Sequence, residues 1–148
     1  MLVRDYMTQS VTTLRDDACL LDAALLIRRT GKRHVPIVSA ETGKVVGIVS
    51  DRDVARLAPS MLSQVTEDEY NTMFESTPIS RAMTKNPISV RSDADITEAV
   101  QTLYAKKISG LLVVDNGELK GIITVTDMLN LLSELLTGAD KSKSAAEM

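Results

Sequence analysis

The chain has 148 residues, is 44% hydrophobic and 25% charged, and carries a formal net charge of −3 at pH 7, which is the composition of a globular protein. The acidic balance, with one Phe, three Tyr and no Trp, argues against a nucleic-acid partner, because such proteins use basic surfaces and aromatic stacking platforms. No apolar run approaches the roughly 18 residues of a membrane span, no signal peptide opens the chain, and a single cysteine excludes an internal disulfide. We therefore expect a cytoplasmic protein with neither a membrane nor a nucleic-acid partner.

The chain repeats its own pattern, and a Met-Thr pair opens each copy: Met7-Thr8 recurs as Met83-Thr84, 76 positions later. At the same offset, both copies carry apolar residues spaced i, i+3, i+4 and i+7, which predicts one buried face of an amphipathic helix. Such self-similarity indicates a fold built from two copies of one supersecondary unit. The first copy has Leu20, Ala23, Ala24 and Ile27 at these places, and the second has Ile96, Ala99, Val100 and Leu103.

Two strands are predicted after the helix of each copy. Residues 35–38 and 111–114 are continuous apolar runs of the kind found in strands buried on both faces. Residues 45–49 and 119–123 form the next strand, at an offset of 74, because the copies differ in length at the intervening turn. A last helix closes each copy. The order strand, helix, strand, strand, helix within about 50 residues is too short to bury a core alone, so we expect the copies to pack together.

The repeat sets the domain boundaries. We place the first copy at residues 1–57 and the second at residues 79–138. Residues 58–78 form a linker, in which Thr66 and the acidic residues after it predict the start of a short helix. Residues 139–148 are small and polar, and we expect them to be a flexible tail.

The most informative motif ends the last strand of each copy: Gly, two apolar residues, Ser or Thr, two variable residues and Asp. One interpretation is structural, since the hydroxyl and the acid have the spacing of a helix-capping pair. The other is functional: a helix start presents free N–H groups that attract phosphate, and a carboxylate one turn later accepts ribose hydroxyls. The two interpretations are compatible. The residues are Ser50 and Asp53 in the first copy, and Thr124 and Asp127 in the second.

The complete pattern resembles a tandem pair of CBS domains, the cystathionine-β-synthase-type regulatory module, over residues 3–57 and 79–136. The resemblance rests on the two Met-Thr pairs, the strand at residues 35–38 and the two Gly-x-x-[Ser/Thr]-x-x-Asp endings. It implies an α/β (α+β) fold of two βαββα repeats packed as a pseudo-twofold pair. It also implies two equivalent clefts, which commonly hold AMP, ADP, ATP or a related adenosyl ligand.

The resemblance assigns roles to particular residues. Asp53 and Asp127 match the acid that binds ribose in this family. Ser50 and Thr124 match the hydroxyl that faces phosphate. Adenine is expected in an apolar slot formed by Val11, Thr12, Val35 and Pro36 in one copy, and by Ile88, Leu111 and Leu112 in the other.

Basic residues of the first copy are expected beside the phosphate. Lys32, Arg33 and His34 precede a strand, and Arg52 lies inside the motif. The alternative for the Lys and Arg residues is a solvated charged surface. A metal role for His34 would need further ligands, and no metal site is predicted. The second copy lacks both the Pro and the basic residues, at residues 108–112, so we expect the two clefts to differ.

The expected function is a regulatory, energy-sensing module that binds an adenine nucleotide and signals to an effector protein in trans. Catalysis is not expected, because the sequence shows no nucleophile with a base and no metal set. The alternative is a ligand-free dimerisation scaffold, and the resemblance implies a homodimer through helices of the repeats. The choice among AMP, ADP, ATP, a dinucleotide and S-adenosylmethionine stays open. The last helix carries the apolar residues Leu129, Leu131, Leu132, Leu135 and Leu136, more than one copy is expected to cover.

Overall fold

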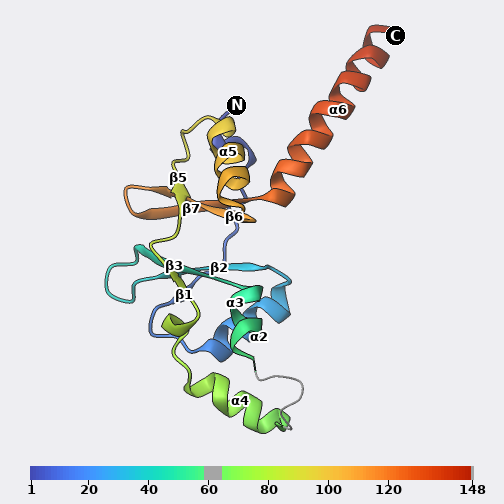
Figure 1. Ribbon diagram of the computed structural model, residues 1–148. Coiled ribbons are helices and arrows are strands. Elements are labelled where there is room, and N and C mark those ends of the chain that lie inside the picture. The colour runs from blue at the N-terminus through green and yellow to red at the C-terminus, as the bar shows by residue number, and fades with distance from the viewer. Residues whose placement is uncertain (59–64, 148) are drawn as a thin grey trace. The chain divides into compact units, whose positions relative to one another are not determined.

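The computed structural model describes the backbone of residues 1–58 and 65–147, and the side chains of these residues up to position 138. The flexible tail predicted for residues 139–148 therefore lies outside the described side chains, and part of the predicted linker lies outside the described backbone. The chain forms two compact units (Figure 1). The first-repeat unit comprises residues 11–87 and 116–119, and the second-repeat unit comprises residues 1–10, 88–115 and 120–148.

The first-repeat unit is built on a four-stranded sheet in the order β1-β2-β3-β4. β1 (Leu14–Arg15) runs parallel to β2 (His34–Val38), and β2 pairs antiparallel with β3 (Val45–Ser50). The crossover between the parallel strands is made by α2 (Leu20–Thr30), as parallel pairing requires. β4 (Thr84–Lys85) pairs antiparallel with β3, although it comes from the start of the second copy.

α2 buries the face that the apolar spacing predicts. Leu20 and Ala23 are at most 1% exposed, and Ala24 and Ile27 pack partly buried against the same core. α3 (Asp51–Leu57) follows β3 directly. Burial of these aliphatic side chains supplies most of the folding free energy, at about 25 cal/mol per Å². The most buried members of this core are Leu20, Ala23, Val35, Ile37, Val49, Phe74 and Ile79.

α4 (Glu67–Ser76) lies in the segment between the repeats. Thr66 caps it, because its hydroxyl accepts a hydrogen bond from the Glu69 N–H at 3.1 Å. Phe74 is 1% exposed, and its ring stacks on Tyr70 with the centroids 4.3 Å apart. This segment is therefore part of the core of the first-repeat unit. A short 3-10 helix, η1 (Ile79–Arg81), then leads to β4.

The second-repeat unit is built on a three-stranded sheet in the order β5-β6-β7. β5 (Ser89–Val90) runs parallel to β6 (Gly110–Asp115), and β7 (Glu118–Thr124) follows β6. α5 (Ile96–Lys106) makes the crossover, and α1 (Val3–Tyr6) comes from the N-terminus of the chain. Both copies thus form strand, helix, strand, strand, helix, which confirms the predicted α/β fold of two βαββα repeats. The core side chains with no exposed surface are Val3, Ala99, Leu111, Val113 and Ile123.

Each unit also holds the Met-Thr pair of the other copy. Thr8 exchanges both backbone hydrogen bonds with Ile122 of β7, at 2.8 and 3.0 Å. Thr84 pairs antiparallel with Ile48 of β3. The compact units therefore do not coincide with the sequence repeats, because the opening segment of each copy pairs with the last strand of the other.

The glycine that starts each Gly-x-x-[Ser/Thr]-x-x-Asp motif is required by this exchange. A Cβ atom at Gly121 would lie 2.7 Å from the Thr8 carbonyl oxygen and 2.9 Å from Met7 Sδ. A Cβ atom at Gly47 would lie 2.7 Å from Met83 Sδ. Only a residue without a side chain permits such an approach. The Met-Thr pairs and the motif glycines, which are far apart in the sequence, are two sides of one contact.

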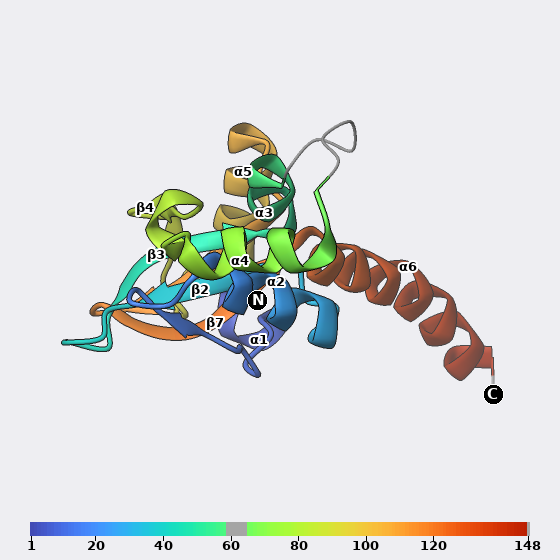
Figure 2. The ribbon, with the colours of Figure 1, turned by 90° about the horizontal axis from the view of Figure 1, so that it is seen from below.

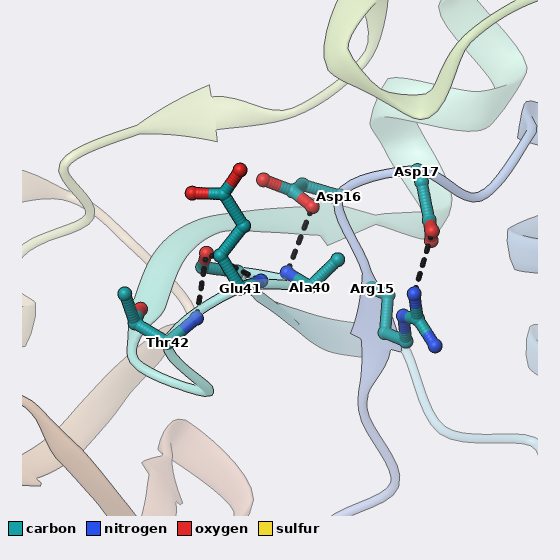
Figure 3. Close-up of polar contacts among 7 residues, drawn as sticks. Arg15, Asp16, Asp17, Ala40, Glu41 and Thr42 are labelled. Atoms are coloured by element: carbon teal, nitrogen blue, oxygen red, sulfur yellow. Dashed lines mark hydrogen bonds and ion pairs between the residues drawn. The ribbon is translucent and has the colours of Figure 1, made fainter.

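The turn between β2 and β3 is held by polar side chains (Figure 3). The Ala40 N–H donates to the Asp16 carboxylate at 3.0 Å, and the Ser39 hydroxyl accepts from two N–H groups of the turn. In the second repeat the acid and the hydroxyl exchange places: Ser92 donates through its N–H and its hydroxyl to Asp115. These hydrogen bonds lower the pKa of Asp115. The acids at these turns therefore serve the fold.

α6 (Val125–Glu147) begins where β7 ends and projects away from the rest of its unit (Figure 1; Figure 2). Leu131, one of the five leucines that together were expected to exceed what one copy covers, is 6% exposed and packs in the core of the unit. Among the described side chains of the helix beyond Leu131, none is buried. The uncovered leucines are Leu129, Leu132, Leu135 and Leu136, which are 59%, 50%, 53% and 63% exposed.

Candidate functional site

β3 ends, and α3 begins, at a reciprocal pair of side chains. The Ser50 hydroxyl oxygen accepts a hydrogen bond from the Asp53 N–H at 3.2 Å. Asp53 Oδ2 accepts from the Ser50 N–H at 2.8 Å and from the Ser50 hydroxyl at 2.9 Å. This arrangement is a capping box, so the structural interpretation of the motif is confirmed for the first copy. The Asp53 side chain is only 14% exposed.

The second copy repeats this geometry at the start of α6. Asp127 Oδ2 accepts from the Thr124 N–H at 2.8 Å and from the Thr124 hydroxyl at 3.0 Å. The Asp127 N–H donates back to the Thr124 hydroxyl oxygen at 3.2 Å. In both copies the cap therefore fixes the carboxylate through Oδ2 and leaves Oδ1 outside the cap.

The two copies differ in the side chain that interacts with Oδ1 of the capping aspartate. Arg56 Nη1 lies 3.7 Å from Asp53 Oδ1, and the Arg56 side chain is 75% exposed. Asp127 Oδ1 accepts a hydrogen bond from the Thr8 hydroxyl at 3.1 Å. Sequence reasoning missed both partners. Arg56 follows Asp53 by one helical turn, and Thr8 belongs to the repeated Met-Thr pair, so both carried a signal in the sequence.

The backbone N–H groups at the start of α3 are already used. The Asp51 N–H donates to the Arg33 carbonyl oxygen at 2.9 Å, and the Arg52 N–H donates to Asp51 Oδ1 at 3.0 Å. The Asp53 N–H donates to Ser50. The expectation that free N–H groups would receive phosphate here is therefore wrong for α3. Any phosphate at this end would have to be held by side chains.

The predicted basic residues of the first copy gather at the start of α3. His34 is half buried on β2, and burial lowers the pKa of its imidazole. The negative charges of Asp51 and Asp53 raise the pKa of His34, and the positive charges of Arg33 and Arg52 lower it. All four charges are therefore near the imidazole. His34 is neutral at pH 7, because a lowered pKa lies below its ordinary value.

The predicted adenine slot is only partly accessible. Val35 and Leu111 are at most 1% exposed and belong to the two hydrophobic cores. Successive side chains of a strand point to opposite faces, and the neighbours Pro36 and Leu112 belong to neither core cluster, although both are buried. Of the other predicted residues, Ile88 is 42% exposed. Val11 is half-buried and Thr12 is exposed.

Within residues 1–58 and 65–138, no group of three or more His, Cys, Asp or Glu side chains is arranged to hold a metal ion. In the same part of the chain, no helix combines the length and the apolar character needed to cross a membrane.

The chain is a tandem of two βαββα repeats, each with a capped acid in the first turn of its last helix, and comparison with known families identifies it. The family model of the CBS domain matches residues 3–60 and 79–134, which together make up more than half of the chain. The chain belongs to the CBS-domain family and contains two CBS domains in tandem.

Two relatives by sequence are named as CBS domain-containing proteins. One from Dictyostelium discoideum is 26% identical over 92% of this chain and 94% of its own length. One from Arabidopsis thaliana is 31% identical over 90% of this chain. This chain covers 23% of the Arabidopsis protein, so it spans about a quarter of that relative's length.

Three solved structures resemble the chain over most of its length. A protein provisionally named as an acetoin utilization protein (AcuB), from Vibrio cholerae, is 33% identical with a TM-score of 0.76, over 95% of this chain and 96% of its own. The CBS domain pair of protein MJ0100, in complex with 5′-methylthioadenosine and S-adenosyl-L-methionine, is 27% identical with a TM-score of 0.72, over 90% and 96%. CBSX2 in complex with AMP is 25% identical with a TM-score of 0.75, over 90% and 97%.

Proposed function

We propose that this CBS pair is a regulatory module that binds an adenine nucleotide (AMP, ADP or ATP) at Asp53 and Asp127. The proposal rests on one observation: the two oxygens of each carboxylate have different partners. Oδ2 is committed to the helix cap and fixes the group, while Oδ1 meets an exchangeable partner, Arg56 or Thr8. A ribose hydroxyl is a donor suited to such an oxygen. The structures of MJ0100 with adenosyl ligands and of CBSX2 with AMP support the same ligand chemistry.

The proposed action is a shift of population between conformations, read by an effector protein in trans. A bound nucleotide favours one conformation by no more than its difference in affinity for the two. We propose binding without catalysis, because each carboxylate is committed to a cap, whereas a general base must be free to change its protonation. We also propose a cytoplasmic location, with which the free thiol of Cys19 agrees.

Calorimetric titration of AMP, ADP and ATP into the wild-type chain tests this function. Asp53→Asn and Asp127→Asn keep a side-chain acceptor for the cap but remove the negative charge, so they separate ligand binding from folding. Asp68→Asn, on the exposed side of α4, is the matched control. The proposal expects heat of binding for at least one nucleotide, lost in at least one of the two site variants and unchanged in the control. No heat for any nucleotide with folded wild-type protein would refute it.

A dimerisation scaffold is the second candidate, and α6 is the observation that favours it. Val125, Leu129, Leu132 and Leu136 are 43% to 63% exposed and are spaced by four, three and four residues, which is the spacing of a coiled-coil seam. We therefore propose that a second copy of the chain covers this seam. A scaffold of this kind would need the seam but neither of the two capped acids.

A further inference from the structure

Three arginines close to the capped acid in the sequence of the first repeat have uncharged counterparts in the second repeat. Positions before the β2–β3 turn correspond at an offset of 76, and positions after it at 74. On this register Arg33, Arg52 and Arg56 correspond to Ser109, Thr126 and Asn130. Each cation of the first repeat is thus replaced by an uncharged side chain in the second.

The backbone around these positions is the same in the two units, so the difference is one of charge. The Arg33 carbonyl oxygen accepts from the Asp51 N–H at 2.9 Å, and the Ser109 carbonyl oxygen accepts from the Val125 N–H at 3.0 Å. These hydrogen bonds anchor residue 33 at the start of α3 and residue 109 at the start of α6. Near Asp53 the anchored residue is an arginine, whereas near Asp127 it is a serine.

Two of the three arginines are available to a ligand. Arg33 and Arg52 are exposed, and within residues 1–58 and 65–138 neither makes an ion pair. Both lie close enough to His34 for their charges to lower its pKa. The N–H groups of α3 are used within the protein, so phosphate affinity at this end depends on these guanidinium groups. Arginine binds phosphate oxygens through paired, charge-assisted hydrogen bonds.

Resting on the proposed function, we infer that the two sites bind adenosyl ligands of different charge. The Asp53 site binds a nucleoside di- or triphosphate, because Arg33 and Arg52 neutralise a polyphosphate chain. The Asp127 site prefers an adenosyl group with an uncharged 5′ substituent to one that carries a polyphosphate. A polyphosphate there would lie near the Asp127 carboxylate without arginines at the positions of Arg33 and Arg52, and uncompensated like charges repel.

Separate titrations of ATP and of 5′-methylthioadenosine test the assignment. Arg33→Ala/Arg52→Ala is compared with Ser109→Ala/Thr126→Ala, which changes the equivalent positions of the second repeat. Loss of a charge-assisted contact costs about tenfold in affinity, so the arginine double variant is expected to bind ATP about 100-fold more weakly. Its affinity for 5′-methylthioadenosine is expected to stay within about twofold. An equal loss for both ligands, or no loss for ATP, would overturn the inference.

A variant that gains ATP binding is also needed, because a loss of ATP binding could result from unfolding alone. Ser109→Arg/Thr126→Arg brings the cations of the first repeat to the second, and it is expected to add ATP binding that Asp127→Asn then removes. Wild-type protein that binds both ligands, with no effect of the arginines on either, defeats this inference but leaves the proposed function standing. Wild-type protein that binds neither of these ligands, and neither AMP nor ADP, defeats both.

Discussion

At the end of β3, Asp53 caps α3 through Oδ2, and its Oδ1 faces Arg56. At the end of β7, Asp127 caps α6 through Oδ2 in the same way, but its Oδ1 accepts a hydrogen bond from the Thr8 hydroxyl. The capping distances in the two copies agree within 0.1 Å. The surroundings differ in charge, since the cations of the first copy have uncharged counterparts in the second. The fold therefore requires the cap in both copies, whereas the side chains around the cap are free to differ.

The largest effect is expected where the two copies exchange their Met-Thr pairs. Gly121→Ala should lower the free energy of unfolding by about 2–3 kcal/mol, because the new Cβ meets a backbone oxygen of Thr8 at 2.7 Å. Gly47→Ala should cost less, about 1–2 kcal/mol, because its nearest neighbour is the flexible end of Met83. Urea denaturation measures both. Gly138→Ala, with no atom within 4 Å of its Cβ, is the control and should not destabilise. An equal cost at the two motif glycines would contradict the proposed difference.

The next effect concerns the closing helices. α3 ends at Leu57, whereas α6 continues past the corresponding Leu131 to Glu147. Leu132→Lys should raise the dissociation constant of the proposed homodimer at least about 100-fold, because a charge would be buried in the seam. Asn130→Lys adds the same charge outside the seam and should leave the dimer intact. Sedimentation velocity over a concentration series measures both, and a wild-type monomer at all concentrations would remove the seam from the account.

A smaller effect on the free energy of unfolding is expected when the partner of each Oδ1 oxygen is removed. Thr8→Val should lower the free energy of unfolding by about 0.5–1 kcal/mol, because Asp127 loses an exposed hydrogen bond to its charged carboxylate. Arg56→Ala should change it by less than about 0.5 kcal/mol, because the ion pair is long and the Arg56 side chain is 75% exposed. Thermal denaturation of the two variants tests the order. A larger cost for Arg56→Ala would show that the cation supports the fold.

The smallest effect is a pH dependence confined to the first site. Burial lowers the pKa of His34, so the imidazole is neutral at pH 7, and a nearby polyphosphate would favour its protonated form. ATP affinity should therefore rise by about threefold, relative to His34→Gln, as the pH falls from about 7.5 to 5.5. The comparison with His34→Gln cancels the titration of ATP itself. Gly110 occupies the corresponding position of the second copy, so binding of 5′-methylthioadenosine should not respond. Equal pH dependence of ATP affinity in the wild-type protein and in His34→Gln would show that His34 does not lie near the phosphates.

The lowered pKa of His34 also makes the stability of the fold depend on pH. A folded-state pKa of His34 below its unfolded value means that the unfolded chain binds more protons in the window between the two values. Stability therefore rises with pH through that window and falls as the pH drops below the ordinary pKa of histidine. Wild-type protein should lose this increment on acidification, and His34→Gln should not.

Much of the fold could be predicted from the sequence, because repeated local patterns have local causes. The spacing around Leu20 fixed the buried face of α2, and the Ser50–Asp53 spacing fixed a cap. The exchange of Met-Thr pairs could not be predicted, since an offset of 76 residues shows that Thr8 and Thr84 are equivalent but not which strand each one pairs with.

Side-chain direction at the candidate site was the harder problem. A continuous apolar run such as residues 35–38 does not show which side chains face the core, and Val35 proved to be a core residue. The N–H groups of α3 are taken by Arg33 and Asp51, which depends on how β2 meets β3 and so on tertiary pairing. The cations themselves were visible in the sequence.

Native mass spectrometry of the wild-type chain with saturating ATP and 5′-methylthioadenosine together distinguishes two sites of different charge from one shared site. Two sites of different charge predict a species that carries one ATP and one 5′-methylthioadenosine per chain, which loses ATP in Asp53→Asn and 5′-methylthioadenosine in Asp127→Asn. Competition of the two ligands for one site, or a chain that retains neither of them, would contradict the account.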